Sequence, residues 1–177
     1  MGLRTIVPQP CIDAMKRLAL TSPAGAFAEV GVYQGGSAAE LYTIAQAQHR
    51  ELHLFDTFRG MPVSISGLDY HKRGEFADVN LPTIMFNLPE AKFHVGIFPQ
   101  TLPQNMPPLA FIHCDCDQYE SYKAVIAHLW PLLVPGGRLL FDDYPYLLGA
   151  KKAVEETFDQ ASLLDSGSGR YYVEKPK

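Results

Sequence analysis

Carboxylates gather after two apolar stretches of this sequence. Asp115 and Asp117 follow LAFIHC, and Asp142 and Asp143 follow RLLF. If the two stretches are neighbouring parallel strands, their carboxyl ends bring the four acids to one edge of a sheet. Like charges raise one another's pKa, so such a cluster is costly without a cation. All-oxygen ligands suit Mg²⁺, Ca²⁺ or Mn²⁺, so the pattern predicts a divalent-metal site. The alternative is that each aspartate caps a separate turn or helix.

His113, Cys114 and Cys116 lie within the same run. Strand alternation would put His113, Asp115 and Asp117 on one side, provided that the strand extends that far. His113 is then a metal ligand, a base or a semi-buried histidine satisfied by its neighbours, and the last is the default. The two cysteines point the other way and are interpreted as small buried hydrophobic residues.

A glycine-rich turn, EVGVYQGGS, follows another apolar run. The turn is not the GxGxxG of a diphosphate site, and Glu29 lies inside the strand. This pattern favours a ligand with an amino group and no phosphate, over an ordinary glycine turn. Ser37 is expected to cap the next helix, with Glu40 completing a capping box.

Asp56 ends the next predicted strand, ELHLFD. An acid at this position can accept hydrogen bonds from both ribose hydroxyls, as in dinucleotide-binding folds. The alternative is that Asp56 caps the turn that follows it. The ribose interpretation is favoured, because the glycine turn precedes Asp56 by about 20 residues.

The elements that must position these residues alternate along the chain. Such alternation predicts an α/β fold with a largely parallel sheet covered on both faces. Apolar runs predict strands over 26–32, 51–56, 92–96, 109–115 and 138–142, the last after a turn at 135–137, with two closing strands near 161–164 and 170–174. Helical spacing of apolar residues predicts helices over 10–20, from 37, and over 80–88, 119–130 and 149–159.

Length and composition predict one domain over residues 1–177. The chain has 177 residues, of which 47% are hydrophobic, enough for one sizeable core. Within it, residues 1–25 form an N-terminal helical segment, and residues 57–80 form a loop or lid over a site. A net charge of −4 argues against nucleic acid or a membrane surface as partner. No run is long enough to span a membrane, and there is no secretory leader. The three cysteines, an odd number, indicate reduced thiols and a cytoplasmic protein.

Taken together, these segments resemble class I S-adenosylmethionine (SAM)-dependent methyltransferases, and within them the macrocin O-methyltransferase-like family of sugar O-methyltransferases. The resemblance covers nearly the whole chain from residue 25. Its most specific segments are FDTFRGMP, HCDCDQYES and FDDY. It implies a Rossmann-like fold with a seven-stranded sheet.

The resemblance also implies roles for individual residues. Asp56 would bind the ribose of SAM, with Thr57 beside it, and Phe98 would lie near the adenine. Asp115 would contact both SAM and Mg²⁺. The methionine part of SAM would contact a set that also occurs in catechol O-methyltransferase: Glu29, Gly31, Tyr33, Gly35 and Ser37. The Mg²⁺ ligands would be Asp115, Asp142 and Asp143.

The implied reaction is Mg²⁺-dependent methylation of a hydroxyl on a sugar or a glycosylated small molecule. Catechol O-methyltransferase carries a catalytic lysine three residues after its first metal-binding aspartate, where this chain has Gln118. The catalytic candidates are therefore Asp115, His113 and Asp117, or a metal-bound hydroxyl. Only about 25 residues precede the first predicted strand, so the acceptor site is expected to be open or completed by the second subunit of a homodimer.

Three other functions remain open at this point. The first is an NAD(P)-dependent oxidoreductase, which would need a better diphosphate turn. The second is a non-catalytic SAM-binding domain, which the short N-terminal segment allows. The third is a metal-dependent phosphoester hydrolase, which would use clustered aspartates without an adenosyl cofactor.

Overall fold

A seven-stranded, mostly parallel sheet organises the computed structural model, which describes residues 2–62 and 64–177. The strand order is β3-β2-β1-β4-β5-β7-β6, and only the pairings of β7 are antiparallel. This confirms the predicted Rossmann-like fold class. The strands are β1 (Ala26–Val30), β2 (Leu52–Asp56), β3 (Lys92–Val95), β4 (Leu109–Cys114), β5 (Leu133–Phe141), β6 (Leu164–Asp165) and β7 (Tyr171–Glu174).

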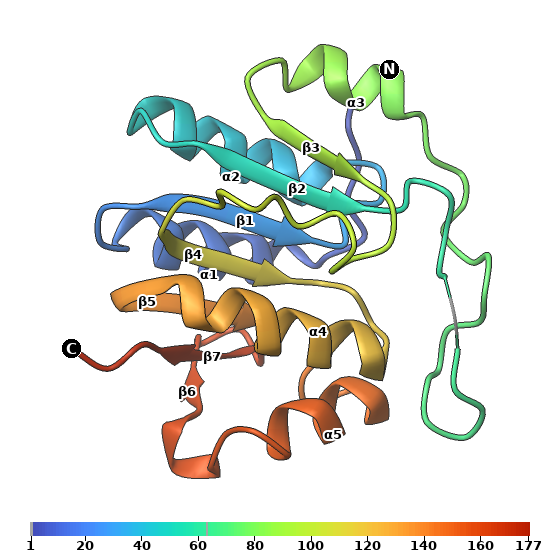
Figure 1. Ribbon diagram of the computed structural model, residues 1–177, viewed down its shortest axis with the longest axis vertical. Helices are drawn as coiled ribbons and strands as arrows, with labels where there is room; N and C mark the ends of the chain where they lie inside the picture. The colour runs from blue at the N-terminus through green and yellow to red at the C-terminus, as the bar shows by residue number, and fades with distance from the viewer. Residues whose placement is uncertain (1, 63) are drawn as a thin grey trace.

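Helices cover both faces of the sheet (Figure 1). One apolar cluster joins α1, α2 and α3 to one face, and the other joins α4 and α5 to the opposite face. Burial on both faces explains why the central strands read as continuous apolar runs. The helices are α1 (Gln9–Leu20), α2 (Gly36–Ala47), α3 (Leu81–Asn87), α4 (Tyr119–Leu129) and α5 (Leu148–Glu155), with 3₁₀ turns at Trp130–Leu132 and Gln160–Ser162. Among the described helices, none is long and apolar enough to cross a membrane.

The predicted capping box at the start of α2 is wrong. The helix begins at Gly36, and Gly35 precedes it in the left-handed region with φ of +80°. Ser37 makes no capping hydrogen bond and is buried, while Glu40 pairs with Lys16 of α1. The fold of the turn, and not a side-chain cap, therefore begins this helix.

Two predicted strand boundaries also differ. Strand β5 begins at Leu133, which pairs with Leu109 of β4, and the register shifts before Arg138 pairs with Phe111, so that the predicted turn at 135–137 lies within the strand. Backbone hydrogen bonds from Gly136 to Lys175 and from Lys175 to Gly137 hold this part of the strand. The strand expected near 161–164 is a 3₁₀ turn followed by the two-residue β6.

The segment 97–108 packs on the sheet face that α4 covers, through Phe98, Leu102 and Met106. Phe98 packs edge-on against Phe55 of β2, with ring centroids 5.2 Å apart, and Phe55 stacks on His94 of β3. Burial and the neighbouring His53 lower the pKa of His94 to about 4, so its ring is neutral at neutral pH. The result is an uncharged aromatic wall at the carboxyl ends of β2 and β3.

Candidate active site

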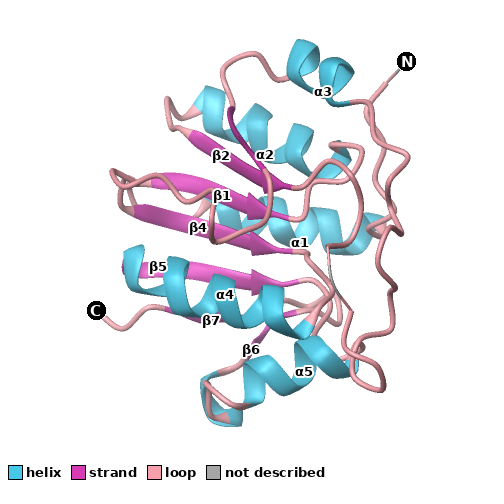
Figure 2. Cartoon of the chain, turned by 45° about the vertical axis from the view of Figure 1, so that its right-hand side comes forward, coloured by secondary structure: helices cyan, strands magenta, loops and turns pink. Residues whose placement is uncertain are grey.

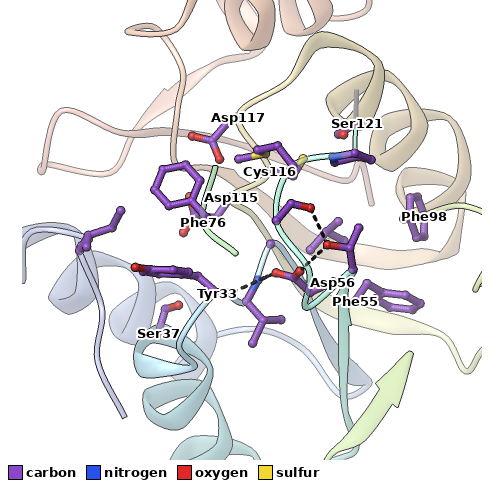
Figure 3. A pocket seen from close by; sticks show the side chains of 18 of the residues that line it. Tyr33, Ser37, Phe55, Asp56, Phe76, Phe98, Asp115, Cys116, Asp117 and Ser121 are labelled. Carbon is purple, nitrogen blue, oxygen red and sulfur yellow. Dashed lines mark hydrogen bonds between the residues drawn. The ribbon is translucent and has the colours of Figure 1, made fainter. Parts of the chain in front are cut away.

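A pocket opens at the carboxyl ends of β1, β2 and β4 (Figure 3). Its empty space, with the solvent-open mouth included, is about 900 Å³. The long loop after β2 passes over this end of the sheet (Figure 2). Seven of the nine predicted cofactor-binding residues line the pocket: Gly31, Tyr33, Ser37, Asp56, Thr57, Phe98 and Asp115.

Gly31 allows two backbone segments to meet at the floor of the pocket. Its φ is +90°, and a Cβ there would fall 1.6 Å from the carbonyl oxygen of Asp115. The Asp115 amide also donates to the Val30 carbonyl at 2.9 Å. The glycine is thus required for the contact between β1 and the end of β4, which brings Asp115 beside the turn.

Four backbone amides of the turn after β1 are paired within the protein. Those of Val32 and Tyr33 donate to the Asp56 carboxylate at 2.7 and 3.0 Å (Figure 3). Those of Gly35 and Gly36 donate to the carbonyls of Val32 and Arg4. A diphosphate site needs such amides free to face the ligand. The turn is therefore unsuited to a dinucleotide, which argues against the oxidoreductase alternative.

Asp56 performs the capping role and also faces the pocket. Besides the two amides of the turn, its carboxylate accepts from the Phe58 amide at 2.7 Å. It remains part of the pocket lining, next to Thr57. The geometry of Asp56 is thus compatible both with capping the turn and with binding a ribose.

Glu29 and His113 are not among the residues that line the pocket, and the burial of His113 beside Glu29 agrees with the default expectation for the histidine. Glu29 is fully buried, and its Oε1 lies 2.8 Å from Nδ1 of His113, on the sheet face that α1 and α2 cover. Nε2 of His113 lies 3.7 Å from Oδ1 of Asp142. Burial disfavours the imidazolium, but the flanking carboxylates Asp142 and Glu29 outweigh it and raise the pKa of His113 well above its usual value. A buried, charged imidazole is not suited to accept a proton from an acceptor, so His113 is a weak candidate for the base.

Gly35 is also absent from the described lining, although it starts α2 beside it. Gln118, at the lysine position of the catechol enzyme, is buried immediately before α4.

Three carboxylates meet as the sequence predicts. Asp115, Asp142 and Asp143 each offer an oxygen within 4.8 Å of the others. Burial and the neighbouring acids raise the pKa of Asp115 well above its usual range, and burial with Asp142 raises that of Asp143 to about 6. Burial has the same tendency at Asp142, but His113 and Arg170 lower its pKa overall. The cluster carries the electrostatic strain that a bound cation would relieve.

The outer members of the cluster are held in place. The Asp117 amide and the Tyr122 hydroxyl both donate to Oδ2 of Asp143 at 2.9 Å. Oδ2 of Asp142 lies 3.4 Å from a guanidinium nitrogen of Arg170.

Asp117 lines the pocket, but not through strand alternation. Strand β4 ends at Cys114, and Asp117 has a left-handed φ of +58°. Asp115 and Asp117 therefore face the pocket while His113 is buried elsewhere, so the predicted common side for the three residues is wrong. Burial and the charges of Asp143 and Asp142 raise the pKa of Asp117 well above its usual range. Oδ1 of Asp117 lies 3.5 Å from Nε2 of His71 on the loop.

The loop over residues 57–80 is anchored at both ends of the pocket. Asp69 accepts from the Tyr119 amide at the start of α4, at 2.8 Å. Asp78 accepts from the Tyr33 hydroxyl at 2.9 Å. Between these anchors Phe76 packs edge-on against Tyr33, with centroids 5.3 Å apart, and lines the pocket (Figure 3).

The sequence analysis missed several residues of the site. Residues 4–7 line the pocket because Arg4 forms a bridge with Gly35, a contact across the chain that no local pattern announces. Met61, Phe76 and Ser121 also line it, and Arg170 reaches Asp142 from the β6–β7 hairpin. Of these, Met61 and Ser121 lie within motifs quoted above, FDTFRGMP and HCDCDQYES.

Comparison with known proteins relates this chain to methyltransferases. A family model, Macrocin-O-methyltransferase (TylF), matches residues 9–166. The chain is 27% identical over 177 aligned positions to mycinamicin III 3''-O-methyltransferase of Micromonospora griseorubida, covering 89% of this chain and 68% of the relative. It is 31% identical to a rhamnosyl-tetracenomycin 4'-O-methyltransferase of Streptomyces olivaceus. This match covers 68% of this chain and 53% of the relative. A third relative, demethyldecarbamoylnovobiocin O-methyltransferase of Streptomyces niveus, is 29% identical, and the chain covers 57% of its length.

Two solved structures share the fold. The O-methyltransferase NovP superposes with a TM-score of 0.83 at 24% identity, covering 98% of this chain and 82% of NovP. The calicheamicin methyltransferase CalS11 superposes with a TM-score of 0.80 at 21% identity, covering 93% and 77%. The family match spans most of the chain and agrees with the fold. The chain therefore belongs to the macrocin O-methyltransferase (TylF) family.

Proposed function

We propose that this chain is a SAM-dependent O-methyltransferase that uses Mg²⁺ and methylates a hydroxyl of a sugar or glycosylated small molecule. One observation carries the proposal: Asp115 belongs both to the pocket below the glycine turn and to the three-carboxylate cluster. A small-molecule site and a cation site thus adjoin at one residue. The family supports the reaction, and the mycinamicin and tetracenomycin relatives support the substrate class.

The pocket suits SAM in its chemistry. The aromatic wall of Phe55 and Phe98 matches a flat, apolar adenine, and Asp56 with Thr57 offers oxygens to a ribose. Tyr33, Ser37 and Asp115 would hold the methionine part, with Gly31 shaping the floor. Glu29 and Gly35 would act only through the shape of the turn. When bound, SAM supplies an activated methyl group.

The acidic cluster suits Mg²⁺. Asp115, Asp142 and Asp143 supply oxygen ligands, and the raised pKa values of Asp115 and Asp143 fit a site that a cation would neutralise. Bound there, Mg²⁺ would lower the pKa of an acceptor hydroxyl and orient it. Of the three carboxylates, Asp142 is the one whose negative charge is balanced by direct contacts, with the side chains of Arg170 and His113.

Asp117 is the best-placed residue to take the acceptor's proton. It lines the pocket next to the cluster, and its side chain is partly accessible, with 17% exposed. His71, 3.5 Å away, orients the carboxylate from the loop. Residues 57–80 would then act as a lid that excludes water, with Phe76 against the pocket.

The remaining organisation follows from the same proposal. Residues 1–177 act as one methyltransferase domain, in which the segment 1–25 covers part of the pocket through residues 4–7. The three cysteines are buried and free, which fits reduced thiols and a cytoplasmic protein. A homodimer remains the expected assembly, with neither nucleic acid nor membrane as partner.

A methyl-transfer assay tests this function. The protein is incubated with SAM and either mycinamicin III or one of a panel of rhamnosides, with Mg²⁺ or with EDTA. We expect one panel member to gain the mass of one methyl group in the Mg²⁺ reaction alone. Methylation undiminished by EDTA would contradict the metal assignment. SAM binding without methylation of any sugar would favour the non-catalytic alternative.

A further inference from the structure

Tyr146 is an exposed aromatic residue that is nevertheless held in place. It lies just beyond β5, and 62% of it is exposed to solvent. The guanidinium of Arg170 lies over its ring, 4.7 Å from the centroid. The Tyr146 amide also donates to the Asp143 carbonyl at 2.8 Å, which ties its backbone to the acidic cluster.

Gly169 provides room for the hydroxyl end of the same side chain. A Cβ at this position would lie 2.7 Å from the Tyr146 hydroxyl, and Gly169 has a left-handed φ of +80°. The β6–β7 hairpin thus contacts Tyr146 twice, through Arg170 at the ring and through Gly169 at the hydroxyl. An exposed aromatic ring that is fixed on one side presents a defined surface on its open side.

Arg170 connects this ring to the proposed reaction centre. The guanidinium that covers Tyr146 also lies 3.4 Å from Oδ2 of Asp142, which belongs to the carboxylate cluster. One side chain therefore fixes the position of the ring relative to a candidate metal ligand. The ring is thus one side chain away from that cluster.

We propose that Tyr146 is the platform on which the sugar ring of the acceptor rests. A pyranose has an apolar face of C–H groups that packs against an aromatic ring, while its hydroxyls remain free to reach the carboxylates. The proposal rests on the proposed function for its choice of ligand. It assigns to Tyr146 binding and orientation of the sugar, with no part in proton transfer.

The test compares Tyr146→Ala, Tyr146→Phe and Phe86→Ala with the wild type. Phe86 is an exposed aromatic residue on α3, a helix that contributes no residue to the carboxylate cluster, and serves as the matched control. Calorimetry measures S-adenosylhomocysteine binding, and saturation-transfer NMR then measures the affinity of methyl α-L-rhamnopyranoside in its presence. Mannitol, which has hydroxyls but no ring face, is the control ligand.

We expect Tyr146→Ala to weaken rhamnoside binding about fivefold to tenfold, the size of one aromatic contact. Tyr146→Phe and Phe86→Ala should stay within about twofold of wild type, and S-adenosylhomocysteine affinity should not change in any variant. Three results would overturn the platform. The first is unchanged rhamnoside affinity in Tyr146→Ala, and the second is an equal loss of affinity for mannitol. The third is no rhamnoside binding by a wild type that binds S-adenosylhomocysteine. Rhamnoside binding that depends on Tyr146 in a protein that does not bind S-adenosylhomocysteine would keep the platform and contradict the proposed function instead.

Discussion

The double substitution Asp142→Asn with Asp143→Asn should abolish metal-dependent methyl transfer and leave cofactor binding intact. The two changes remove two of the three carboxylates that meet within 4.8 Å, while the amides keep nearly the same shape. Neither residue lines the described cofactor pocket. Loss of a residue that only supports a metal ligand costs about 10–100-fold in affinity, so loss of two ligands should exceed about 100-fold.

Mn²⁺ binding followed by electron paramagnetic resonance measures this effect directly, and calorimetry with S-adenosylhomocysteine measures the cofactor. Asp159→Asn is the matched control, because Asp159 is exposed and lies before the 3₁₀ turn near β6. It should bind Mn²⁺ like the wild type. Mg²⁺-dependent turnover that survives the double substitution would show that the cation lies elsewhere or is not needed.

Gly31→Ala should destabilise the fold more than any other single glycine substitution at the turn after β1. An added Cβ would overlap the carbonyl oxygen of Asp115 at 1.6 Å, and φ of +90° is unfavourable for alanine. Backbone strain costs about 1–3 kcal/mol and overpacking a further 1–3 kcal/mol, so the expected loss is about 3 kcal/mol or more.

Gly67→Ala separates the two contributions. Gly67 also has a positive φ, +79°, but nothing lies within 4 Å of an added Cβ. Gly67→Ala should therefore lower the free energy of unfolding through backbone strain alone, by about 1 kcal/mol. Urea denaturation of both variants gives the two free energies of unfolding. Equal losses would mean that β1 and the end of β4 can separate without cost, contrary to the contact that defines the pocket floor.

The main elements of the fold could be predicted because burial imposes simple patterns. Strands covered on both faces read as apolar runs, and their carboxyl ends carry Asp56, Asp115, Asp142 and Asp143, so the gathering of the acids followed from topology. The predictions that failed depended on where a strand stops. Because β4 ends at Cys114, alternation no longer relates His113 to Asp117, and the histidine pairs with Glu29 instead.

The contacts that the sequence analysis missed join segments far apart in the chain. Arg4 meets Gly35 and Gly36, and Arg170 meets Asp142 and Tyr146, and none of these pairs shares a local motif. Ser37 shows the converse case. Its sequence context matches a capping box, but packing at the pocket floor buries it and lets Gly35 start the helix. Tertiary contacts decide such details, which local patterns cannot encode.

Cofactor binding is the central claim, and calorimetric titration tests it most directly. The wild-type protein is titrated with S-adenosylhomocysteine and, separately, with NADH, each with Mg²⁺ and with EDTA. We expect saturable, micromolar binding of S-adenosylhomocysteine and no binding of NADH, because the amides of Val32, Tyr33, Gly35 and Gly36 are already paired and not free for a diphosphate. Binding of NADH without S-adenosylhomocysteine, or of neither molecule under any condition, would contradict it.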